Sequence, residues 1–372
     1  MQINLVRVSI KYLANSGSLL LGLVCILRLP ETSTIQPGHF LIVFLSFLGI
    51  CSLFVCKKIP IYACFFLYFL LVDAIWVLQV DNPLYERLAN NVLLFFSICF
   101  LYNFYSSNTI ERLRYLLLGL TITLTIGLIF DFLRLVEIIN YREYIYSGYI
   151  RSDYPRAIGL SGTSQHLLLY TIFSFGLSYS LSKFDKLSIF ILIINSILSK
   201  TRAGLIILLI YIIKLIKYNI KNYLLIINIL LIITICLYLV NQYTDLFQDQ
   251  LKRFEDTKLI EEVLHRGIHK IINNPTYLIF GAGNVGIHYE SEISSQIHNI
   301  LIELFFSYGV IGLILGISYH FLIYRHFGVT VLFFVLIIGT TITWNMNIIF
   351  PLTISILLCL EKLRLQSQIS ID

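Results

Sequence analysis

Four arginines in polar segments of this chain are suited to holding an anionic ligand. They are Arg151, Arg156, Arg202 and Arg266. The guanidinium group stays charged at any physiological pH, and it binds phosphate or carboxylate through two parallel hydrogen bonds. A single arginine beside an apolar segment is, however, often an interfacial residue that reaches toward lipid headgroups. Whether these arginines belong to a binding site therefore depends on where they lie in the fold.

One histidine is suited to act as a base. His298 lies in Gln296-Ile-His298-Asn299, and Glu303 follows it. An imidazole changes charge near neutral pH, so a neutral histidine can remove a proton from a hydroxyl group. A lone histidine at the end of an apolar segment is more often capped or solvated than catalytic. On a helix, Glu303 lies about 140° from His298 and is the i,i+4 neighbour of Asn299. Glu303 or Asn299 is the candidate to orient the base.

A glycine pattern precedes this histidine. Gly281-Ala-Gly283-Asn-Val-Gly286 matches G-x-G-x-x-G, follows the strand-like stretch Thr276–Phe280, and has Glu303 about twenty residues further on, as in dinucleotide-binding folds. No βαβ unit surrounds it, and Glu303 falls in an apolar segment, so we reject the nucleotide reading. Gly281 and Gly283 stay candidates for substrate binding, because glycines let backbone N–H groups approach anionic oxygens closely.

The composition places these residues in a membrane protein. The chain has 372 residues, of which 58% are hydrophobic and 13% charged, with a mean hydropathy of +0.83. Soluble domains carry about a quarter charged residues, and disordered chains are rich in charge and poor in aromatics. Continuous apolar runs such as Tyr223–Val240 are typical of membrane helices and not of alternating barrel strands. The predicted fold class is an all-α polytopic integral membrane protein, with residues 1–372 forming a single membrane domain.

Twelve apolar segments are predicted to span the membrane, with eleven as the alternative count because 187–199 and 203–218 are short. They are 13–29, 39–56, 59–79, 88–105, 115–138, 165–182, 187–199, 203–218, 223–243, 297–319, 327–343 and 347–361. Every second connection is basic, and this rule predicts both termini in the cytoplasm. The basic residues are Lys57, Lys58, Arg112, Arg114, Lys183, Lys186, Lys214, Lys217, Lys221, Arg325, Lys362 and Arg364.

Two long loops are predicted on the opposite, outer side. Residues 140–164 form a loop of about 25 residues, and residues 244–296 form one of about 53. Most of the polar chemistry falls in them, together with the short basic link Lys200-Thr-Arg202. A basic link on the outer side opposes the charge rule, and an anionic ligand at the membrane surface would explain it. The seven cysteines all fall in apolar segments, so we expect neither a disulfide framework nor a metal site.

Asp73, Asp131, Arg134 and Glu137 are further charges in or near the membrane. Of these, Asp131 and Arg134 form an i,i+3 pair, and we interpret that pair as structural. A small-residue face for close helix packing is predicted at Gly309, Gly312 and Gly316.

The ordered set of motifs resembles the O-antigen polymerase and O-antigen ligase superfamily of bacterial envelope glycan assembly. In chain order the matching pieces are Arg156-Ala-Ile-Gly159 (R-x-x-G), Ser199-Lys-Thr-Arg202-Ala-Gly204 (S-x-S-R-G), Arg266 with Asn274-Pro275 and Gly281-Ala-Gly283 (R…N-P-L-x-G-x-G), and His298-Asn299 with Gly309-Val-Ile-Gly312 (H-N…G-I-I-G). The resemblance covers about residues 150–320. Lys200-Thr201 depart from the pattern, which often has a small residue and a serine at these two positions, whereas Arg202 agrees with it.

The resemblance implies a metal- and cofactor-independent membrane glycosyltransferase of the bacterial inner membrane. It would transfer a glycan from undecaprenyl pyrophosphate to an acceptor sugar hydroxyl at the periplasmic face, in lipopolysaccharide biosynthesis. On that interpretation Arg156, Arg202 and Arg266 hold the pyrophosphate and His298 is the base. Arg151, in the same loop as Arg156, and Asn299 are further candidate substrate-binding residues.

An O-antigen polymerase is favoured over an O-antigen ligase, which would use lipid A core as acceptor. A flippase-like transporter of lipid-linked repeats is the alternative from another class, disfavoured because the charges gather in outer loops. The partners are the lipid-linked glycan and the bilayer, without nucleic acid. A separate chain-length regulator is a further candidate partner.

Overall fold

The protein is all-α throughout the part of the chain that the structure describes. The computed structural model describes residues 2–27, 37–56, 58–79, 85–135, 138, 158–161, 163–183, 185–199, 201–218, 275–283, 300–339 and 349–369. These residues form eleven helices: α1 Gln2–Val24, α2 Pro37–Cys56, α3 Ile61–Val77, α4 Tyr85–Ser106, α5 Thr109–Leu135, α6 Ser164–Leu181, α7 Asp185–Leu198, α8 Arg202–Tyr218, α13 Pro275–Phe280, α15 Ile300–Gly339 and α16 Ile349–Ile369. The predicted all-α class is confirmed.

Among the described residues, three helices are long and apolar enough to cross a membrane. They are Leu88–Ser106 in α4, Thr109–Leu133 in α5 and Glu303–Gly339 in α15. Shorter apolar helices cover His39–Val55, Ile61–Val77 and Ala203–Ile213. These spans indicate a membrane protein. The count of twelve segments is not confirmed, and the predicted segment 223–243 lies outside the described residues.

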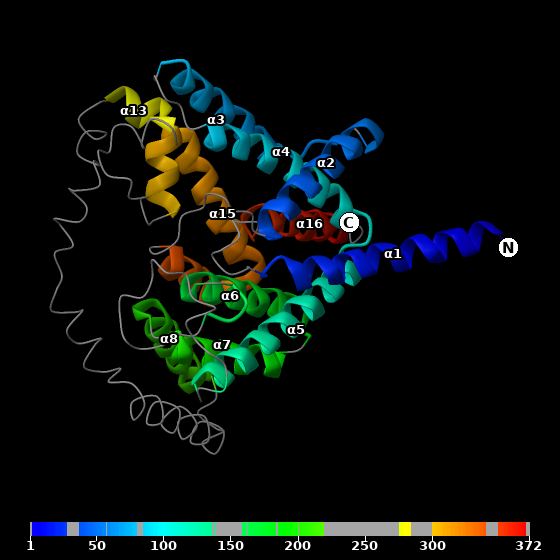
Figure 1. Cartoon of the computed structure of the whole chain (residues 1–372), viewed down its shortest axis with the longest axis vertical. Helices are drawn as coiled ribbons and strands as arrows, with labels where there is room; N and C mark the ends of the chain where they lie inside the picture. Colours follow the sequence, from blue (N-terminus) through cyan, green and yellow to red (C-terminus); the bar gives the residue numbers. More distant parts are fainter. Residues whose placement is uncertain are drawn as a thin grey trace.

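Glycines bring the first helices into close contact. A Cβ atom added at Gly22 of α1 would lie 2.5 Å from the carbonyl oxygen of Leu116 on α5, and one at Gly119 of α5 would lie 2.4 Å from that of Leu19. These close approaches lie where α1 and α5 run side by side in Figure 1. Small residues allow such backbone contact between membrane helices, where apolar burial alone does not drive association.

The basic residues in the described connections lie at one end of the helix bundle. Asn103 near the end of α4 donates its Nδ2 proton to the carbonyl of Lys58, at 3.1 Å, and Cys359 of α16 contacts the carbonyl of Tyr102, at 3.5 Å. We call the end of the bundle that contains Lys58, Asn103 and Cys359 the basic end. The positive-inside rule groups basic connections of this kind on one side of the membrane.

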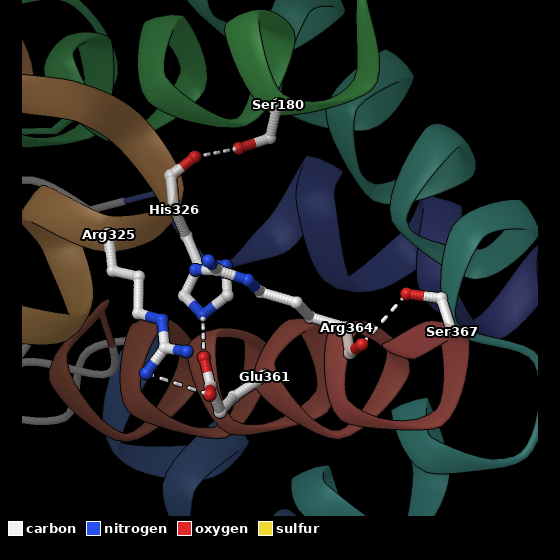
Figure 2. Close-up of polar contacts among 6 residues, drawn as sticks. All are labelled: Ser180, Arg325, His326, Glu361, Arg364 and Ser367. Atoms are coloured by element: carbon white, nitrogen blue, oxygen red, sulfur yellow. Dashed lines mark hydrogen bonds and ion pairs between the residues drawn. The ribbon is translucent and has the colours of Figure 1, made fainter. Parts of the chain in front are cut away.

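A polar cluster joins three helices at the basic end, as Figure 2 shows. Glu361 of α16 accepts from Nη1 of Arg325 at 3.0 Å and from Nε2 of His326 at 2.9 Å. Ser180, at the end of α6, donates to the backbone carbonyl of His326 at 2.6 Å. The cluster therefore fixes α6 and α16 against the middle of α15, and Arg364 points toward the same histidine (Figure 2).

Helix α15 changes direction at its second turn. Tyr308 (φ −134°, ψ 18°) and Gly309 (φ 61°, ψ −147°) leave helical geometry, and Gly328 does so again (φ 85°, ψ 169°). A Cβ atom at Gly312 would lie 2.0 Å from the carbonyl oxygen of Leu304, although eight residues of straight helix span about 12 Å. Residues 300–307 thus fold back on residues 310–316. We call residues 300–316 the hairpin; its two limbs lie side by side below α13 in Figure 1.

Candidate functional site

The described parts of all four sequence motifs lie at the end of the bundle opposite the basic end. Helix α6 runs from just beyond Gly159 to Ser180, which contacts His326 at the basic end. Helix α15 runs from Gly309 to the same His326, and α7 runs from beside the end of α6 to Ser199. Each motif is thus one helix length from the basic end, and α6 alone, with 18 residues, spans about 27 Å.

The glycine loop, residues 281–283, interlocks with the turn of the hairpin. Gly281 (φ 87°) and Gly309 (φ 61°) both have positive φ. A Cβ atom at Gly281 would lie 2.2 Å from the carbonyl oxygen of Ser307, and one at Gly309 would lie 2.1 Å from that of Ile279. The backbone N–H of Ala282 donates to the carbonyl of Phe306 at 2.9 Å. Only glycine fits at either position, so the third and fourth motifs meet through their glycines.

Helix α13, which precedes the glycine loop, corrects the expected strand at Thr276–Phe280. The segment is the short helix Pro275–Phe280. Proline presets the backbone for the first helical position, and a glycine at positive φ directly after the helix ends it. The N–H of Gly281 donates to the carbonyl of Tyr277 at 2.8 Å, which closes the last turn.

A hydrogen-bonded triad, Asp73–Asn91–Tyr308, lies beneath the hairpin turn. Oδ2 of Asp73 on α3 accepts from Nδ2 of Asn91 on α4 at 2.6 Å and from the hydroxyl of Tyr308 at 3.0 Å. The Asn91 amide also lies 3.2 Å from that hydroxyl. All three side chains are almost fully buried, at 0%, 1% and 0% exposure. The Tyr308 ring stacks on Phe69, with centroids 3.7 Å apart.

The glycine loop lies against the same triad. A Cβ atom at Gly283 (φ 66°) would lie 2.7 Å from Oδ1 of Asp73 and 3.0 Å from the Trp76 ring. The hydroxyl of Tyr68, also on α3, donates to the carbonyl of Phe280 at 2.8 Å. Helix α3 therefore holds both ends of the glycine loop. The predicted substrate-binding role of Gly281 and Gly283 stays a prediction beside this packing role.

Glu303 lies on the first limb of the hairpin. Its side chain is buried, at 4% exposure, five residues before Tyr308 in the chain. An acidic residue within a membrane helix normally faces the bundle interior, as Glu303 does here.

The first motif is held by a buried carboxylate. Asp131, near the end of α5 and 2% exposed, accepts from the backbone N–H of Gly159 at 2.7 Å and from that of Ile158 at 3.2 Å. Gly159 has a positive φ of 53°, and the Cα atom of Gly159 would be 3.1 Å from a Cβ atom at Gly127. Two successive N–H groups of this kind form an anion-binding concavity, and here Asp131 fills it. The side chain of Arg134, the expected partner of Asp131, lies outside the described residues.

The second motif is the tight link between α7 and α8. Thr201 caps α8, because its Oγ1 accepts from the backbone N–H of Gly204 at 3.0 Å, and Ser199 Oγ lies 3.2 Å from the same Oγ1. A Cβ atom at Gly204 would lie 2.5 Å from the carbonyl oxygen of Ser196, so α7 and α8 turn tightly on each other. Arg202 therefore begins α8 as its first residue; its side chain lies outside the described residues.

The structure describes three of the expected site residues: Gly281 and Gly283 lie in the glycine loop, and Glu303 lies on the first limb of the hairpin, against which that loop packs. The other expected residues lie outside the described residues: Arg151, Arg156, Arg266, His298 and Asn299, together with the side chain of Arg202. Sequence reasoning missed Asn91 and Tyr308. The signal that existed was Asp73, a charge in an apolar segment that needs polar partners. Among the described residues no group of three or more metal-binding side chains occurs.

Comparison with known proteins gives no matching family model, no matching curated protein and no matching solved structure.

Proposed function

We propose that this chain is a membrane glycosyltransferase that extends an O-antigen by transferring undecaprenyl-pyrophosphate-linked repeat units. The observation that carries the proposal is the common location of the four motifs: Gly159, Thr201, the glycine loop and the hairpin all lie at the end opposite the basic end. Residues scattered over about 150 positions of sequence thus share one end of the bundle. A transferase that works on lipid-linked substrates needs its site residues at one end of the bundle, at the membrane surface.

The finer topology belongs to the same proposal. The chain spans the bacterial inner membrane twelve times with both termini in the cytoplasm, and segments 140–164 and 244–296 lie in the periplasm. The basic end then faces the cytoplasm, in agreement with the positive-inside rule. The opposite end, which carries the four motifs and which we call the motif end, faces the periplasm, where lipid-linked repeats are polymerised in the superfamily that the sequence resembles.

The proposed reaction is a substitution at the anomeric carbon of the lipid-linked sugar. An acceptor hydroxyl oxygen attacks that carbon, the bond to the pyrophosphate oxygen breaks with its electron pair, and His298 takes the hydroxyl proton. Negative charge grows on the leaving pyrophosphate, so arginines that bind it more tightly in the transition state accelerate the reaction. Arg156, Arg202 and Arg266 have this role, while Glu303 or Asn299 orients His298. The reaction requires neither cofactor nor metal.

Gel analysis of lipopolysaccharide in a chromosomal deletion strain tests the proposal. We expect the deletion to leave core with a single repeat unit, wild type to restore the ladder, and Arg202→Ala to fail. Lys183→Ala is the control, since it removes an exposed positive charge at the basic end, away from the four motifs, and should restore the ladder. Membrane levels of each variant are compared by immunoblot. An unchanged ladder in the deletion strain would refute the proposal.

Two other outcomes identify the alternatives. Bare core with full-length polymer on the lipid carrier would indicate a ligase. Purified protein in vesicles that moves lipid-linked repeats across the bilayer without lengthening them would indicate a transporter.

A further inference from the structure

We propose that Asp73 is a positioning residue, which holds the hairpin and the glycine loop in the one arrangement that transfer requires. Nothing in the sequence motifs includes Asp73, Asn91 or Tyr308. The inference rests on the proposed function for its activity measurement, while its structural part stands on the contacts alone.

The first step is that Asp73 joins elements that are far apart in sequence. One oxygen of its carboxylate accepts from Asn91 on α4 and from Tyr308 in the hairpin turn, at 2.6 Å and 3.0 Å. Its other oxygen lies against Gly283, where a Cβ atom would come within 2.7 Å. Helices α3 and α4, the hairpin and the glycine loop therefore converge on one carboxylate.

The second step is that the hairpin turn depends on contacts from outside its own helix. Tyr308 and Gly309 leave helical geometry, which interrupts the backbone hydrogen bonds of α15 within a candidate membrane span. Non-helical backbone at membrane depth is tolerated only where protein or water satisfies it. The N–H of Ala282 satisfies the carbonyl of Phe306 at 2.9 Å, and Phe69 covers the Tyr308 ring. The glycine loop and α3 thus complete the turn.

The third step concerns why a polar residue holds this place. A buried carboxylate is costly unless it is hydrogen-bonded, so it is a poor way to fill space but a specific way to fix partners. Loss of Asp73 would leave the Tyr308 hydroxyl and the Asn91 amide without their shared acceptor. Glu303 lies five residues before Tyr308, on the first limb of the hairpin. A displacement of the hairpin turn therefore moves Glu303 as well. Displacements of about 1 Å can cost about a hundredfold in rate.

The experiment combines a position readout with kinetics on purified full-length protein in lipid nanodiscs. The position readout is cross-linking of Trp76→Cys with Tyr277→Cys by a short thiol reagent, in a background without the other cysteines, since the two rings lie 5.7 Å apart. Glycan transfer from lipid-linked repeats is measured without the cysteine pair. The variants are Asp73→Ala, Asp73→Asn and Tyr308→Phe, which keeps the stacked ring and loses only the hydroxyl.

We expect Asp73→Ala to lower the cross-linking yield about fivefold and kcat about tenfold or more, with KM within about twofold. Asp73→Asn keeps an oxygen that can accept from both donors, so it should retain both readouts within about threefold. Tyr308→Phe should fall between them. Ser97→Ala is the matched control: Ser97 is equally buried on α4, but it bonds Ser46 on α2, and both readouts should stay unchanged.

The two proposals fail in different ways. Cross-linking of Asp73→Ala at the wild-type yield would overturn the inference whatever the activity. Reduced cross-linking with unchanged kcat would also overturn it, because the hairpin position would not matter for transfer. Wild-type protein that cross-links efficiently but never lengthens the glycan would instead refute the proposed function.

Discussion

At the residue scale, Asp131 acts as a built-in anion for the first motif. Its two oxygens accept the N–H groups of Ile158 and Gly159, and it is 2% exposed. A hydrogen bond to a charged group contributes about 1.5–3 kcal/mol, and an unsatisfied buried N–H costs about 1–3 kcal/mol. We expect Asp131→Ala to lower the free energy of unfolding by about 2–4 kcal/mol. Asp131→Asn should lower the free energy of unfolding by roughly half as much, because the amide nitrogen of the new side chain faces one of the two N–H donors.

Thermal unfolding of the purified protein in detergent measures this difference. Asp185→Ala is the control, since Asp185 is exposed and accepts a hydrogen bond from the Ser178 hydroxyl at 3.0 Å. Equal melting temperatures for Asp131→Asn and wild type would argue that the N–H groups find other acceptors.

Two glycines give a matched pair for the close packing of the glycine loop. Gly283→Ala places a methyl group 2.7 Å from Asp73 Oδ1 at a positive φ of 66°, and the backbone strain alone costs about 1–3 kcal/mol. Gly17→Ala, within α1, meets only Phe104 at 3.9 Å. There the added methyl should be neutral or stabilise by up to about 1 kcal/mol. The melting temperature should therefore fall for Gly283→Ala and stay unchanged or rise for Gly17→Ala, and a harmless Gly283→Ala would contradict the packing described here.

What the sequence predicts at this scale follows from residue type. Asp73 and Glu303 stand out because charges are rare in apolar segments, and both are buried. Asn91 and Tyr308 carry no such signal, since neutral polar and aromatic side chains are common in membrane helices. Their role arises only when α15 folds back and brings Tyr308 to Asp73, which no local pattern encodes.

At the element scale, the link between α7 and α8 depends on one threonine. Thr201 precedes Arg202 where the superfamily pattern often has serine, and its Oγ1 caps α8 at the N–H of Gly204. Loss of such a cap typically costs about 1 kcal/mol. We expect Thr201→Ala to lower stability by that amount, and Thr201→Ser to restore it. A melting temperature of Thr201→Ser as low as that of Thr201→Ala would indicate that the methyl group, and not the cap, matters.

The sequence predicts several helix boundaries well, but it does not predict the break in α15 at Tyr308–Gly309. The segments 88–105, 165–182 and 203–218 match α4, α6 and α8 closely, because hydropathy follows the apolar run directly. The described parts of the segments 297–319 and 327–343 fall in one helix, α15, whose breaks lie at Tyr308–Gly309 and at Gly328. The Gly328 break lies beside the predicted connection between the two segments, whereas the Tyr308–Gly309 break lies inside a continuous apolar run and leaves hydropathy unchanged. The Tyr308–Gly309 break depends on the glycine loop that packs against it, about thirty residues earlier in the chain.

At the scale of the whole molecule, the two ends of the bundle differ in chemistry. Lys58 and Lys183 lie at the basic end, next to Asn103 and Ser178 respectively. Thr276, in α13, lies at the motif end beside the glycine loop. The positive-inside rule could group the basic connections from the sequence, because each connection adds its own positive charge to the bias that sets the orientation. The rule could not predict which residues meet at the motif end, since the position of long connections depends little on their charge.

This polarity predicts opposite accessibility for cysteines placed at the two ends. In a cysteine-free background, Thr276→Cys should react with a membrane-impermeant maleimide in intact spheroplasts, whereas Lys58→Cys and Lys183→Cys should react only after the membrane is opened. All three native side chains are exposed, so burial does not limit the reaction. Labelling of all three from the same side would contradict the two-ended arrangement. Reaction of the two lysine positions alone in intact cells would keep that arrangement but reverse its orientation, and the motif end would then face the cytoplasm, which would contradict the proposed function.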